Sequence, residues 1–257
     1  MFSRTDPSDH FDILAETAEW IAVNKSSGVL SHPTKPGGPQ TLWHGLRDLL
    51  AFEIVNGGKI SLINRLDRET SGVVLVAKTT RIASHLARAM AGGKIHKEYL
   101  AIVLGWPAQN EFEVHLPILR LGEVAFSSVW LKRAVHPEGA SAKTLFRVEK
   151  RLLHPLAGRI SLIRAIPLTG RTHQIRVHLA HSGHPVVGDK LYGASETYYL
   201  QFIEEGWNPS LQALLYLPRH ALHSTSMEVH TGEMHMGWKC GLPADMNQFL
   251  QISSEVL

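Results

Sequence analysis

The chain has 257 residues and a formal net charge of +3 at pH 7, and its hydrophobic fraction of 44% is typical of a globular protein, which excludes a disordered or fibrous chain. No stretch approaches the roughly 18 continuous apolar residues of a membrane span, and the N-terminal segment lacks the apolar core of a secretory signal. The single cysteine, Cys240, excludes an intramolecular disulfide, so we expect a cytoplasmic protein with no membrane partner.

The N-terminal part of the chain alternates between strand-like and helix-like segments. In WIAVNKSSGVLSHP the pattern predicts two short strands on either side of a turn at residues 26–28. Apolar residues spaced three and four apart predict a helix over residues 42–52. The apolar run at residues 73–77 predicts a strand, and residues 79–91 predict a second helix that ends at two glycines.

The middle of the chain consists of successive strand-like segments. Residues 96–106 are predicted to form a strand buried on both faces. Residues 125–135, 142–153 and 158–168 each alternate partly between apolar and polar side chains. This alternation predicts three successive strands of a mostly antiparallel sheet.

A short helix and a hairpin complete the predicted elements. The helix is predicted to begin after Gly170 and to end at Gly183. The hairpin is predicted within residues 221–240, with its turn at Thr231 and Gly232.

These elements indicate an α/β fold of the α+β type, in which helices flank a mixed, chiefly antiparallel sheet. We expect a flexible tail at residues 1–12 and a single folded domain over residues 13–257. Neither repeats nor a long linker divide that range.

Asp67 lies between two arginines in NRLDRETSG, residues 64–72, immediately before an apolar strand. Positive charge from Arg65 and Arg68 should keep its carboxylate ionised. An ionised carboxylate in a dry cleft can act as a nucleophile or a base. The alternative is a solvated surface turn whose charges pair loosely.

A second motif, KEY, places Lys97 and Tyr99 at the head of an apolar strand. Because side chains alternate between the two faces of a strand, these two share a face. Tyr99 could stack on a flat base and offer its hydroxyl for proton transfer, or it could be a core aromatic with its hydroxyl at the rim.

The third motif is GRTHQIRVHLAHSGHPVVGDKLYG, residues 170–193. It places Arg171 at the start and Arg176 in the middle of the predicted helix. A guanidinium facing Asp67 would hold that carboxylate through paired hydrogen bonds. Alternatively, both arginines contact phosphate or are merely solvated.

Together, NRLDRETSGVVLVAK, KEYLAIVLG and the third motif resemble the ordered motifs of the RluA-type pseudouridine synthases, which isomerise uridine to pseudouridine in ribosomal or transfer RNA. The segments ILAETAEWIAVNKSSGVLSHP and RHALHSTSMEVHTGEMHMGWKCGLPADM are similar to the opening and closing hairpins of that family. The resemblance extends from Ile13 to about Leu250. It implies the pseudouridine synthase fold, with a basic cleft across the sheet.

The resemblance also implies roles for individual residues. Asp67 would be the essential carboxylate, Tyr99 the aromatic against the target base, and Arg176 the salt-bridge partner of Asp67. Arg65 resembles the arginine thought to fill the space left by the flipped nucleotide. Thr70 would help to shape the turn that presents Asp67.

A base inside a stem or a stacked loop must be flipped out before it can react, at a cost of a few kcal/mol, and RNA contacts must offset that cost. We expect these contacts from Arg65, Arg68, Thr70, Lys97, Arg171, His173 and Gln174. The substrate would be ribosomal or transfer RNA, bound by a monomer that needs no cofactor and no metal. Whether Asp67 attacks C6 of uracil or C1′ of the ribose, or assists glycal formation, stays open.

This chain departs from the family pattern in two places. Asn64 stands where the family usually has histidine, which puts the local hydrogen bonds in doubt. Many relatives carry a small N-terminal RNA-binding domain, and the residues before Ile13 are too few to form one. We therefore expect the catalytic domain, residues 13–257, to bind its RNA unaided.

Two other functions fit parts of the sequence. Four histidines between residues 173 and 184 suggest a metal-dependent hydrolase, but their spacing does not align the first two at the i, i+4 positions of a metal-binding pair. A catalytically silent RNA-binding protein is the other alternative. The presence of Asp67, Tyr99 and Arg176 together argues against it.

Overall fold

The computed structural model describes residues 10–232 and 234–256, and its contacts divide the chain into two compact units. Unit 1 contains residues up to 97 together with residues 224–241, and unit 2 contains residues 98–223 together with those from 242 onward. Of the flexible tail predicted for residues 1–12, residues 1–9 lie outside the described residues, whereas Phe11 and Asp12 belong to a strand.

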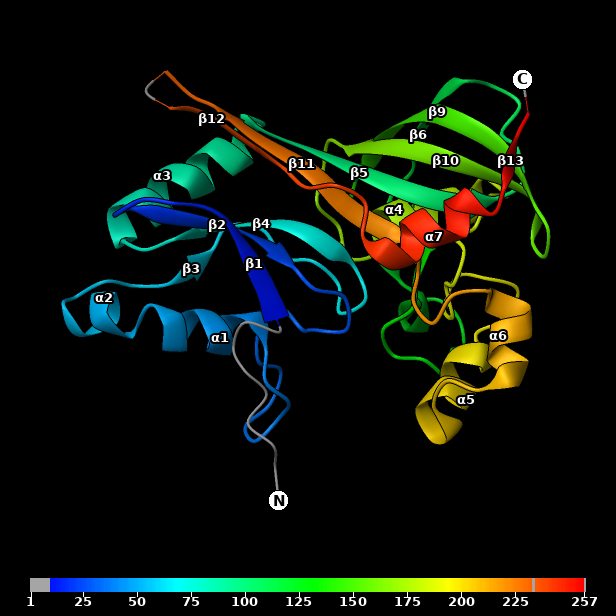
Figure 1. Ribbon diagram of the computed structural model, residues 1–257, viewed down its shortest axis with the longest axis horizontal. Coiled ribbons are helices and arrows are strands. Elements are labelled where there is room, and N and C mark those ends of the chain that lie inside the picture. Colours follow the sequence, from blue (N-terminus) through cyan, green and yellow to red (C-terminus); the bar gives the residue numbers. More distant parts are fainter. Residues whose placement is uncertain (1–9, 233, 257) are drawn as a thin grey trace. The chain divides into compact units, whose positions relative to one another are not determined.

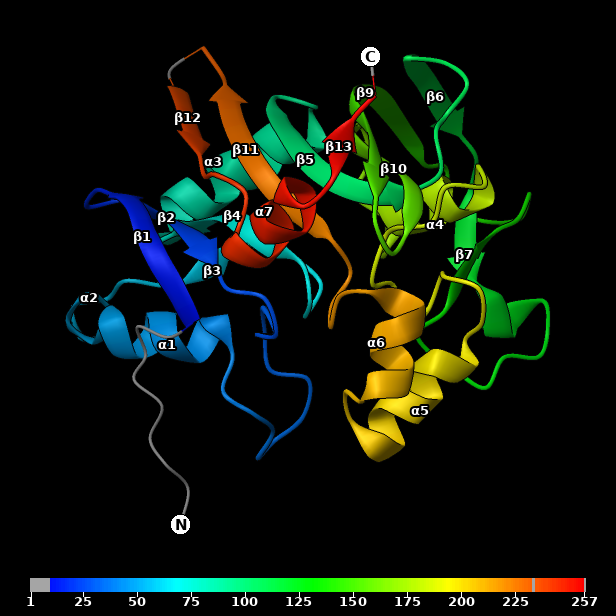
Figure 2. The ribbon, with the colours of Figure 1, turned by 45° about the vertical axis from the view of Figure 1, so that its right-hand side comes forward.

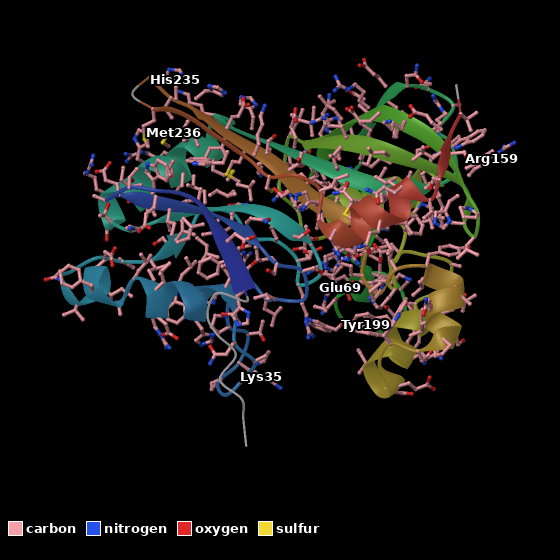
Figure 3. The ribbon with its side chains drawn as sticks, viewed as in Figure 1. Lys35, Glu69, Arg159, Tyr199, His235 and Met236 are labelled. Atoms are coloured by element: carbon pink, nitrogen blue, oxygen red, sulfur yellow. The ribbon has the colours of Figure 1, made fainter. Side chains whose placement is uncertain are left out.

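Unit 1 is a sheet with helices (Figure 1). Its elements are β1 (Phe11–Glu16), β2 (Trp20–Lys25), α1 (Leu42–Leu49), α2 (Ala51–Val55), β3 (Ser61–Leu62), β4 (Ser71–Ala77), α3 (Thr80–Ala91), most of β11 (Leu222–His230) and β12 (His235–Lys239). The strand order is β1-β2-β4-β11, with β3 beside β4 and β12 beside β11. His235 and Met236 lie at the turn end of the β11–β12 hairpin (Figure 3).

The core of unit 1 lies between its sheet and α3. Alternate residues of β4, namely Val73, Leu75 and Ala77, belong to the same buried cluster as Ile82 and Leu86 of α3. Helix α3 begins where Thr79 accepts a hydrogen bond from the backbone N–H of Ile82, and it ends at Gly92. The apolar side chains that alternate along β4 therefore pack against those that recur every four residues along α3, as the sequence predicts.

Unit 2 contains the remaining strands and helices. They are β5 (Ile95–Leu104, which starts in unit 1), β6 (Glu111–His115), β7 (Ile118–Arg120), the short 3-10 helix η2 (Leu121–Glu123), β8 (Arg133–Val135), β9 (Lys143–His154), β10 (Gly158–Pro167), α4 (Gln174–His181), α5 (Thr197–Glu205), α6 (Pro209–Leu215), α7 (Ala244–Gln251) and β13 (Ser254–Glu255). The order is β5-β10-β9-β13, with β6 beside β9, and β7 and β8 form a separate ribbon. All of these pairings are antiparallel.

Two sets of contacts attach helices to the strands of unit 2. Val177 of α4 packs in a buried cluster with Ile118 of β7 and with Leu191 and Tyr192. On α7, the ring of Phe249 stacks on that of His154 of β9, with 4.0 Å between the ring centroids. Helices α5 and α6 lie side by side in both ribbon views (Figures 1 and 2).

The predicted fold class is confirmed: the protein is a mixed α+β structure built mainly on an antiparallel sheet. Strands β2, β4, β5, β9 and β10, helices α1 and α3, and the β11–β12 hairpin lie where the sequence predicts them.

Three local predictions were wrong. Residues 125–132 are not a strand, because Ser127 and Ser128 bond to a distant carboxylate, and only residues 133–135 of that prediction form β8. After the turn at residues 26–28 there is a single bridge between Leu30 and Thr41 in place of a strand. Helix α4 begins at Gln174, so Arg171 lies in the turn before it.

Candidate active site

Asp67 lies in a loop of unit 1 whose backbone is held on both sides. Ser31, whose side chain is buried, donates from its hydroxyl to the carbonyl of Leu66 (2.7 Å) and accepts from the N–H of the same residue (3.1 Å). After Asp67, the carbonyl of Arg68 accepts from the N–H of Gly28 (2.9 Å) and from Nζ of Lys25 (3.3 Å). The Asp67 backbone is therefore fixed by residues about forty positions earlier in the chain.

Lys25 is fully buried at the end of β2. Besides the carbonyl of Arg68, its Nζ donates to the carbonyls of Ser26 and Val29, both at 2.8 Å. These three hydrogen bonds match the three N–H groups of an ammonium. Through them, Lys25 connects the loop at residues 26–29 to the Asp67 loop.

Asn64, which stands in place of the family's usual histidine, attaches the Asp67 loop to β4. Its Nδ2 donates to the carbonyl of Val73 (3.1 Å), and its Oδ1 accepts from the N–H of Leu75 (2.9 Å). The side chain is buried, and it satisfies the N–H of Leu75 and shares the carbonyl of Val73 with the hydroxyl of Ser224 (3.5 Å). This position has a supporting role in the loop.

Glycine is required where the Asp67 loop enters β4. Gly72 has φ of +117°, and a Cβ at this position would lie 2.2 Å from the carbonyl oxygen of Ser224 in β11. Only glycine combines this backbone conformation with so close an approach. The other predicted residues of the loop differ in exposure: Arg65 and Arg68 are exposed, and Thr70 is buried.

Arg176 lies in unit 2, where α4 holds it in a buried ion pair with Asp189. Its Nε and Nη2 donate to the two carboxylate oxygens of Asp189 at 2.6 and 2.8 Å. The guanidinium carbon also lies 4.9 Å from the ring centroid of Tyr192. Two parallel hydrogen bonds and a ring contact fix the plane of the guanidinium.

Asp189 is fully buried and stays ionised. Burial by itself would raise its pKa, but the charge and hydrogen bonds of Arg176 and the backbone N–H of Tyr192 hold the pKa well below its usual range. Its Oδ1 also accepts from the N–H groups of Leu191 and Tyr192, both at 3.0 Å. This carboxylate thus stabilises the turn at residues 188–193. The sequence alone did not indicate that role for Asp189.

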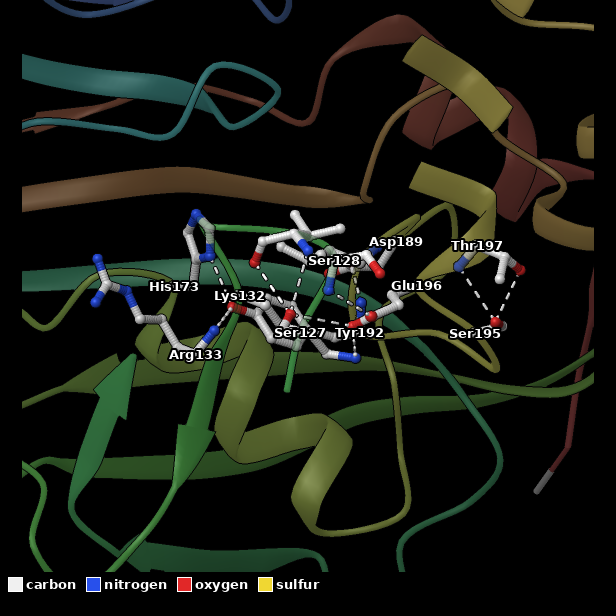
Figure 4. A network of polar contacts seen from close by, with 12 residues as sticks. Ser127, Ser128, Lys132, Arg133, His173, Asp189, Tyr192, Ser195, Glu196 and Thr197 are labelled. Carbon is white, nitrogen blue, oxygen red and sulfur yellow. Dashed lines mark hydrogen bonds and ion pairs between the residues drawn. The ribbon is translucent and has the colours of Figure 1, made fainter. Parts of the chain in front are cut away.

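Tyr192 connects this turn to His173 and Arg133 (Figure 4). Its hydroxyl accepts from the N–H of Arg133 (2.9 Å) and shares a hydrogen bond with Nδ1 of His173 (2.7 Å). His173 precedes α4 in the left-handed conformation, with φ of 59°, which few residues other than glycine adopt. The hydrogen bond to Tyr192 helps to hold that conformation.

Gln174 is buried, and its side-chain amide is occupied by four hydrogen bonds. Oε1 accepts from the Thr169 hydroxyl (2.7 Å) and the Arg171 N–H (3.0 Å), and Nε2 donates to the Lys143 carbonyl (3.0 Å) and the Thr144 hydroxyl (2.9 Å). These bonds use all the donors and acceptors of an amide. The side chain therefore holds the start of α4, and its amide has no donor or acceptor left for a contact with RNA.

His178 continues this network beneath α4. The carbonyl of Leu116 can only accept, so Nε2 carries the proton, and Nδ1 accepts from the Thr144 hydroxyl (2.9 Å). Burial lowers the pKa of His178, which keeps the ring neutral in this role.

Arg171, in contrast, is exposed and donates to the carbonyl of Ser141 (3.0 Å).

Tyr99 and Lys97 share one face of β5, as predicted from their spacing. Tyr99 is buried, with 8% of its surface exposed, and it pairs with Ala165 of β10. Burial lowers the pKa of Lys97.

The predicted site residues are divided between the two units. Unit 1 contains Asp67, Arg65, Arg68, Thr70 and Lys97, and unit 2 contains Tyr99, Arg171, His173, Gln174 and Arg176.

Three of the four histidines that suggested a metal site bond to other groups of the protein. Beyond the bonds of His173 and His178 described above, His184 bonds to the carbonyl of Leu104 (3.1 Å). Within residues 10–232 and 234–256, no three histidine, cysteine or acidic side chains form a group that could hold a metal ion. In the same residues, no helix has the length and apolarity of a membrane-spanning segment.

Comparison with known proteins identifies the family. Residues 19–181 match the family described as RNA pseudouridylate synthase. The dual-specificity RNA pseudouridine synthase RluA of Vibrio parahaemolyticus is 34% identical over 76% of this chain and 75% of its own length. Ribosomal large subunit pseudouridine synthase D of Yersinia pestis is 32% identical over 93% of this chain and 69% of its own length.

Solved structures show the same fold. Human RNA Pseudouridylate Synthase Domain Containing 1 superposes with a TM-score of 0.71 at 22% identity, covering 100% of this chain and 92% of the human chain. Human RNA Pseudouridylate Synthase Domain Containing 4 gives a TM-score of 0.68 at 24% identity, over 93% and 92% of the two chains. The chain therefore belongs to the RluA-type RNA pseudouridine synthases, isomerases that act on RNA.

Proposed function

We propose that the protein isomerises a specific uridine of ribosomal or transfer RNA, with Asp67 as its nucleophile. Relatives are named for both kinds of target: the D enzyme for the ribosomal large subunit and RluA for dual specificity. The N-glycosidic bond between N1 and C1′ breaks, a C5–C1′ bond forms, the hydrogen on C5 leaves as a proton, and N1 takes up a proton. These changes balance without an oxidant, a reductant or a cofactor.

The observation that supports this proposal most directly is the fixed backbone around Asp67. Hydrogen bonds from Ser31 and Lys25 hold the residues on either side of it, and Asn64 attaches the loop to β4. A nucleophile held in one position does not lose conformational freedom during the reaction, which lowers the barrier. A solvated surface turn needs no such anchoring.

In this proposal, Arg176 holds the carboxylate of Asp67. Asp189 accepts hydrogen bonds from Nε and Nη2 of the guanidinium and keeps it in one orientation. Tyr99 would lie against the flipped base, and Arg65 would fill the space that the base vacates. Asp189 and Tyr192 would then be positioning residues, because they act through Arg176.

We assign the RNA phosphate contacts to exposed cations near the site. Arg68 and Arg171 are exposed, and each is oriented by a carbonyl: that of Gly28 for Arg68 and that of Ser141 for Arg171. Lys97, which is only partly exposed, would add a third contact. Thr70 would shape the loop, His173 would meet the RNA from the start of α4, and Gln174 supports that helix end from within the protein.

The same proposal includes the organisation and location of the protein. We propose that the two units act together as one catalytic domain over residues 13–257. We further propose that the protein acts as a monomer in the cytoplasm.

The test is to map pseudouridines in total RNA from cells with and without this protein. A site that disappears on deletion should return with the wild type and should not return with Asp67→Asn. Release of tritium from C5-labelled uridine by the purified variant should fall by at least about 1,000-fold. The control is Asp48→Asn, which changes an exposed carboxylate on α1. An Asp67→Asn variant that keeps a tenth of the activity would contradict the proposal.

A further inference from the structure

The segment between β7 and β8 in unit 2 exposes large apolar side chains. Of this segment, defined here as the aromatic segment (residues 120–133), Phe126 is 91% exposed and Trp130 is 74% exposed. Val124 and Leu131 of the same segment are also exposed. Exposed apolar groups that lie together mark sites of interaction, because their hydration disfavours leaving them uncovered.

The aromatic segment is anchored at its base and does not depend on these exposed side chains for its shape. The N–H of Leu121 donates to the carbonyl of Lys132 (2.9 Å), which closes the loop. Val129, between the exposed residues, is buried in the cluster that contains Val177 of α4 and Tyr192. The two aromatic side chains are therefore carried on a fixed support.

Glu196, just before α5, holds the aromatic segment from a second side (Figure 4). Its carboxylate accepts from Nζ of Lys132 (2.8 Å), the N–H of Ser128 (3.3 Å) and the hydroxyl of Ser127 (3.5 Å). The hydrogen bond from Lys132 is the main reason that the pKa of Glu196 is lowered. The carboxylate stays charged and bonded at neutral pH.

The aromatic segment itself carries more basic than acidic side chains. The guanidinium of Arg120 lies over the ring of Trp130, 3.4 Å from its centroid. Arg133 and Lys132 follow at the other end, and Glu123, the one acidic residue between residues 120 and 133, pairs with Arg120 (3.2 Å). Aromatic faces interleaved with arginine and lysine are typical of surfaces that stack unpaired nucleic-acid bases.

We propose that the aromatic segment is an RNA-binding surface on which Phe126 and Trp130 stack unpaired bases of the substrate. The family acts on RNA, which indicates the class of partner. The exposed rings indicate that the contact is by stacking. Through Val129 and the bond between Tyr192 and the N–H of Arg133, the segment is attached to the elements that hold Arg176. The inference rests on the RNA substrate and not on the role of Asp67.

The test measures binding of a short fluorescein-labelled oligoadenosine, and of an RNA duplex of the same length, by fluorescence anisotropy. The double variant Phe126→Ala/Trp130→Ala should bind the oligoadenosine at least about 30-fold more weakly, because it removes two stacked bases that contribute about 1–3 kcal/mol each. Its salt dependence should match the wild type, since stacking releases no counterions. Phe126→Tyr/Trp130→Phe keeps both rings and should bind within about threefold of the wild type.

The matched control is Leu156→Ala/Ile203→Ala, which removes two exposed apolar side chains of unit 2 and should not change affinity. Asp67→Asn should bind like the wild type, so a failure of the proposed nucleophile stays distinct from a failure of this surface. Wild-type affinity of the alanine double variant for oligoadenosine would overturn the inference. An equal loss of affinity for the duplex would also overturn it, because paired bases do not offer their faces.

Discussion

The Asp67 loop of unit 1 and the start of α4 in unit 2 are both fixed, but by different kinds of interaction. Around Asp67, side chains bond to the backbone: Ser31 to Leu66, and Asn64 to Val73 and Leu75. Around Arg176, side chains bond to one another: the guanidinium pairs with Asp189, and Tyr192 bonds to His173. One region uses mostly neutral hydrogen bonds, and the other is centred on a buried ion pair.

This difference determines how each region should respond to substitution and pH. A neutral side chain that bonds to the backbone can be lost at the cost of a few unsatisfied groups, and its contribution does not titrate. A buried ion pair leaves an uncompensated charge when one partner is removed. We therefore expect the Arg176 region to be the more sensitive of the two.

The largest effect is expected for Asp189→Asn, which should lower the free energy of unfolding by about 3–5 kcal/mol because it removes the buried carboxylate that pairs with Arg176. Asp245→Asn removes a carboxylate that pairs with Arg219 but is 37% exposed, and should cost about 1 kcal/mol. Urea denaturation of both variants measures the difference. Equal losses in the two variants would show that burial does not set the strength of these pairs.

Gly72→Ala should lower the free energy of unfolding by about 3 kcal/mol, because the new Cβ would meet the Ser224 carbonyl in a left-handed backbone conformation. Gly93→Ala provides the control. Gly93 also has a positive φ, of +68°, but nothing lies within 4 Å of its added Cβ, so about 1–2 kcal/mol is expected. Similar values in thermal denaturation would mean that the close approach of β4 and β11 can relax.

Asn64→Ala should cost about 2 kcal/mol, since it removes the partner of the Leu75 N–H and one of the hydrogen bonds that the Val73 carbonyl accepts. Turnover should fall as well, because the loop that carries Asp67 loses its attachment to β4. The control, Asn56→Ala, removes an exposed bond to the carbonyl of Phe52 and should change stability by about 0.5 kcal/mol or less. Unchanged turnover of Asn64→Ala at a reduced stability would separate the loop from catalysis.

Acid should affect the Arg176 region first. The pKa of Asp189 is lower in the folded protein than in the unfolded chain, so its contribution to stability is complete above about pH 4 and is lost as the pH falls below that. Glu149, Glu196 and Asp245 in unit 2 also have lowered pKa values, and in unit 1 Glu53 does. Each proton taken up costs at most about 1.4 kcal/mol per pH unit.

Hydrogen exchange measured between pH 5 and pH 3 tests this order. Amide protection in α4 should fall before protection in β4, because the bonds of Asn64 and Ser31 do not titrate. In Asp189→Asn, protection of α4 should start lower and depend less on pH. Loss of protection in β4 before α4 would contradict the comparison.

The local pattern of the sequence predicted the elements that contain the site, because strands and helices depend on periodicity that a short window records. The apolar run before residue 77 became β4, and the four-residue spacing of Ile82 and Leu86 became α3. The resemblance identified the family, and the family match and the relatives confirm it. The local sequence pattern wrongly predicted a strand over residues 125–132. There, Ser127 and Ser128 bond to the carboxylate of Glu196, almost seventy residues later in the chain.

By itself, the sequence determined that this is an α+β RNA pseudouridine synthase in which Asp67 precedes an apolar strand. Only the tertiary structure decided that Lys25 and Ser31 fix the Asp67 backbone, that Asp189 holds Arg176, and that Gln174 has no group left for RNA. The reason is physical: periodicity is a property of neighbouring residues, whereas a buried polar group takes whichever partner the folded chain brings within about 3 Å.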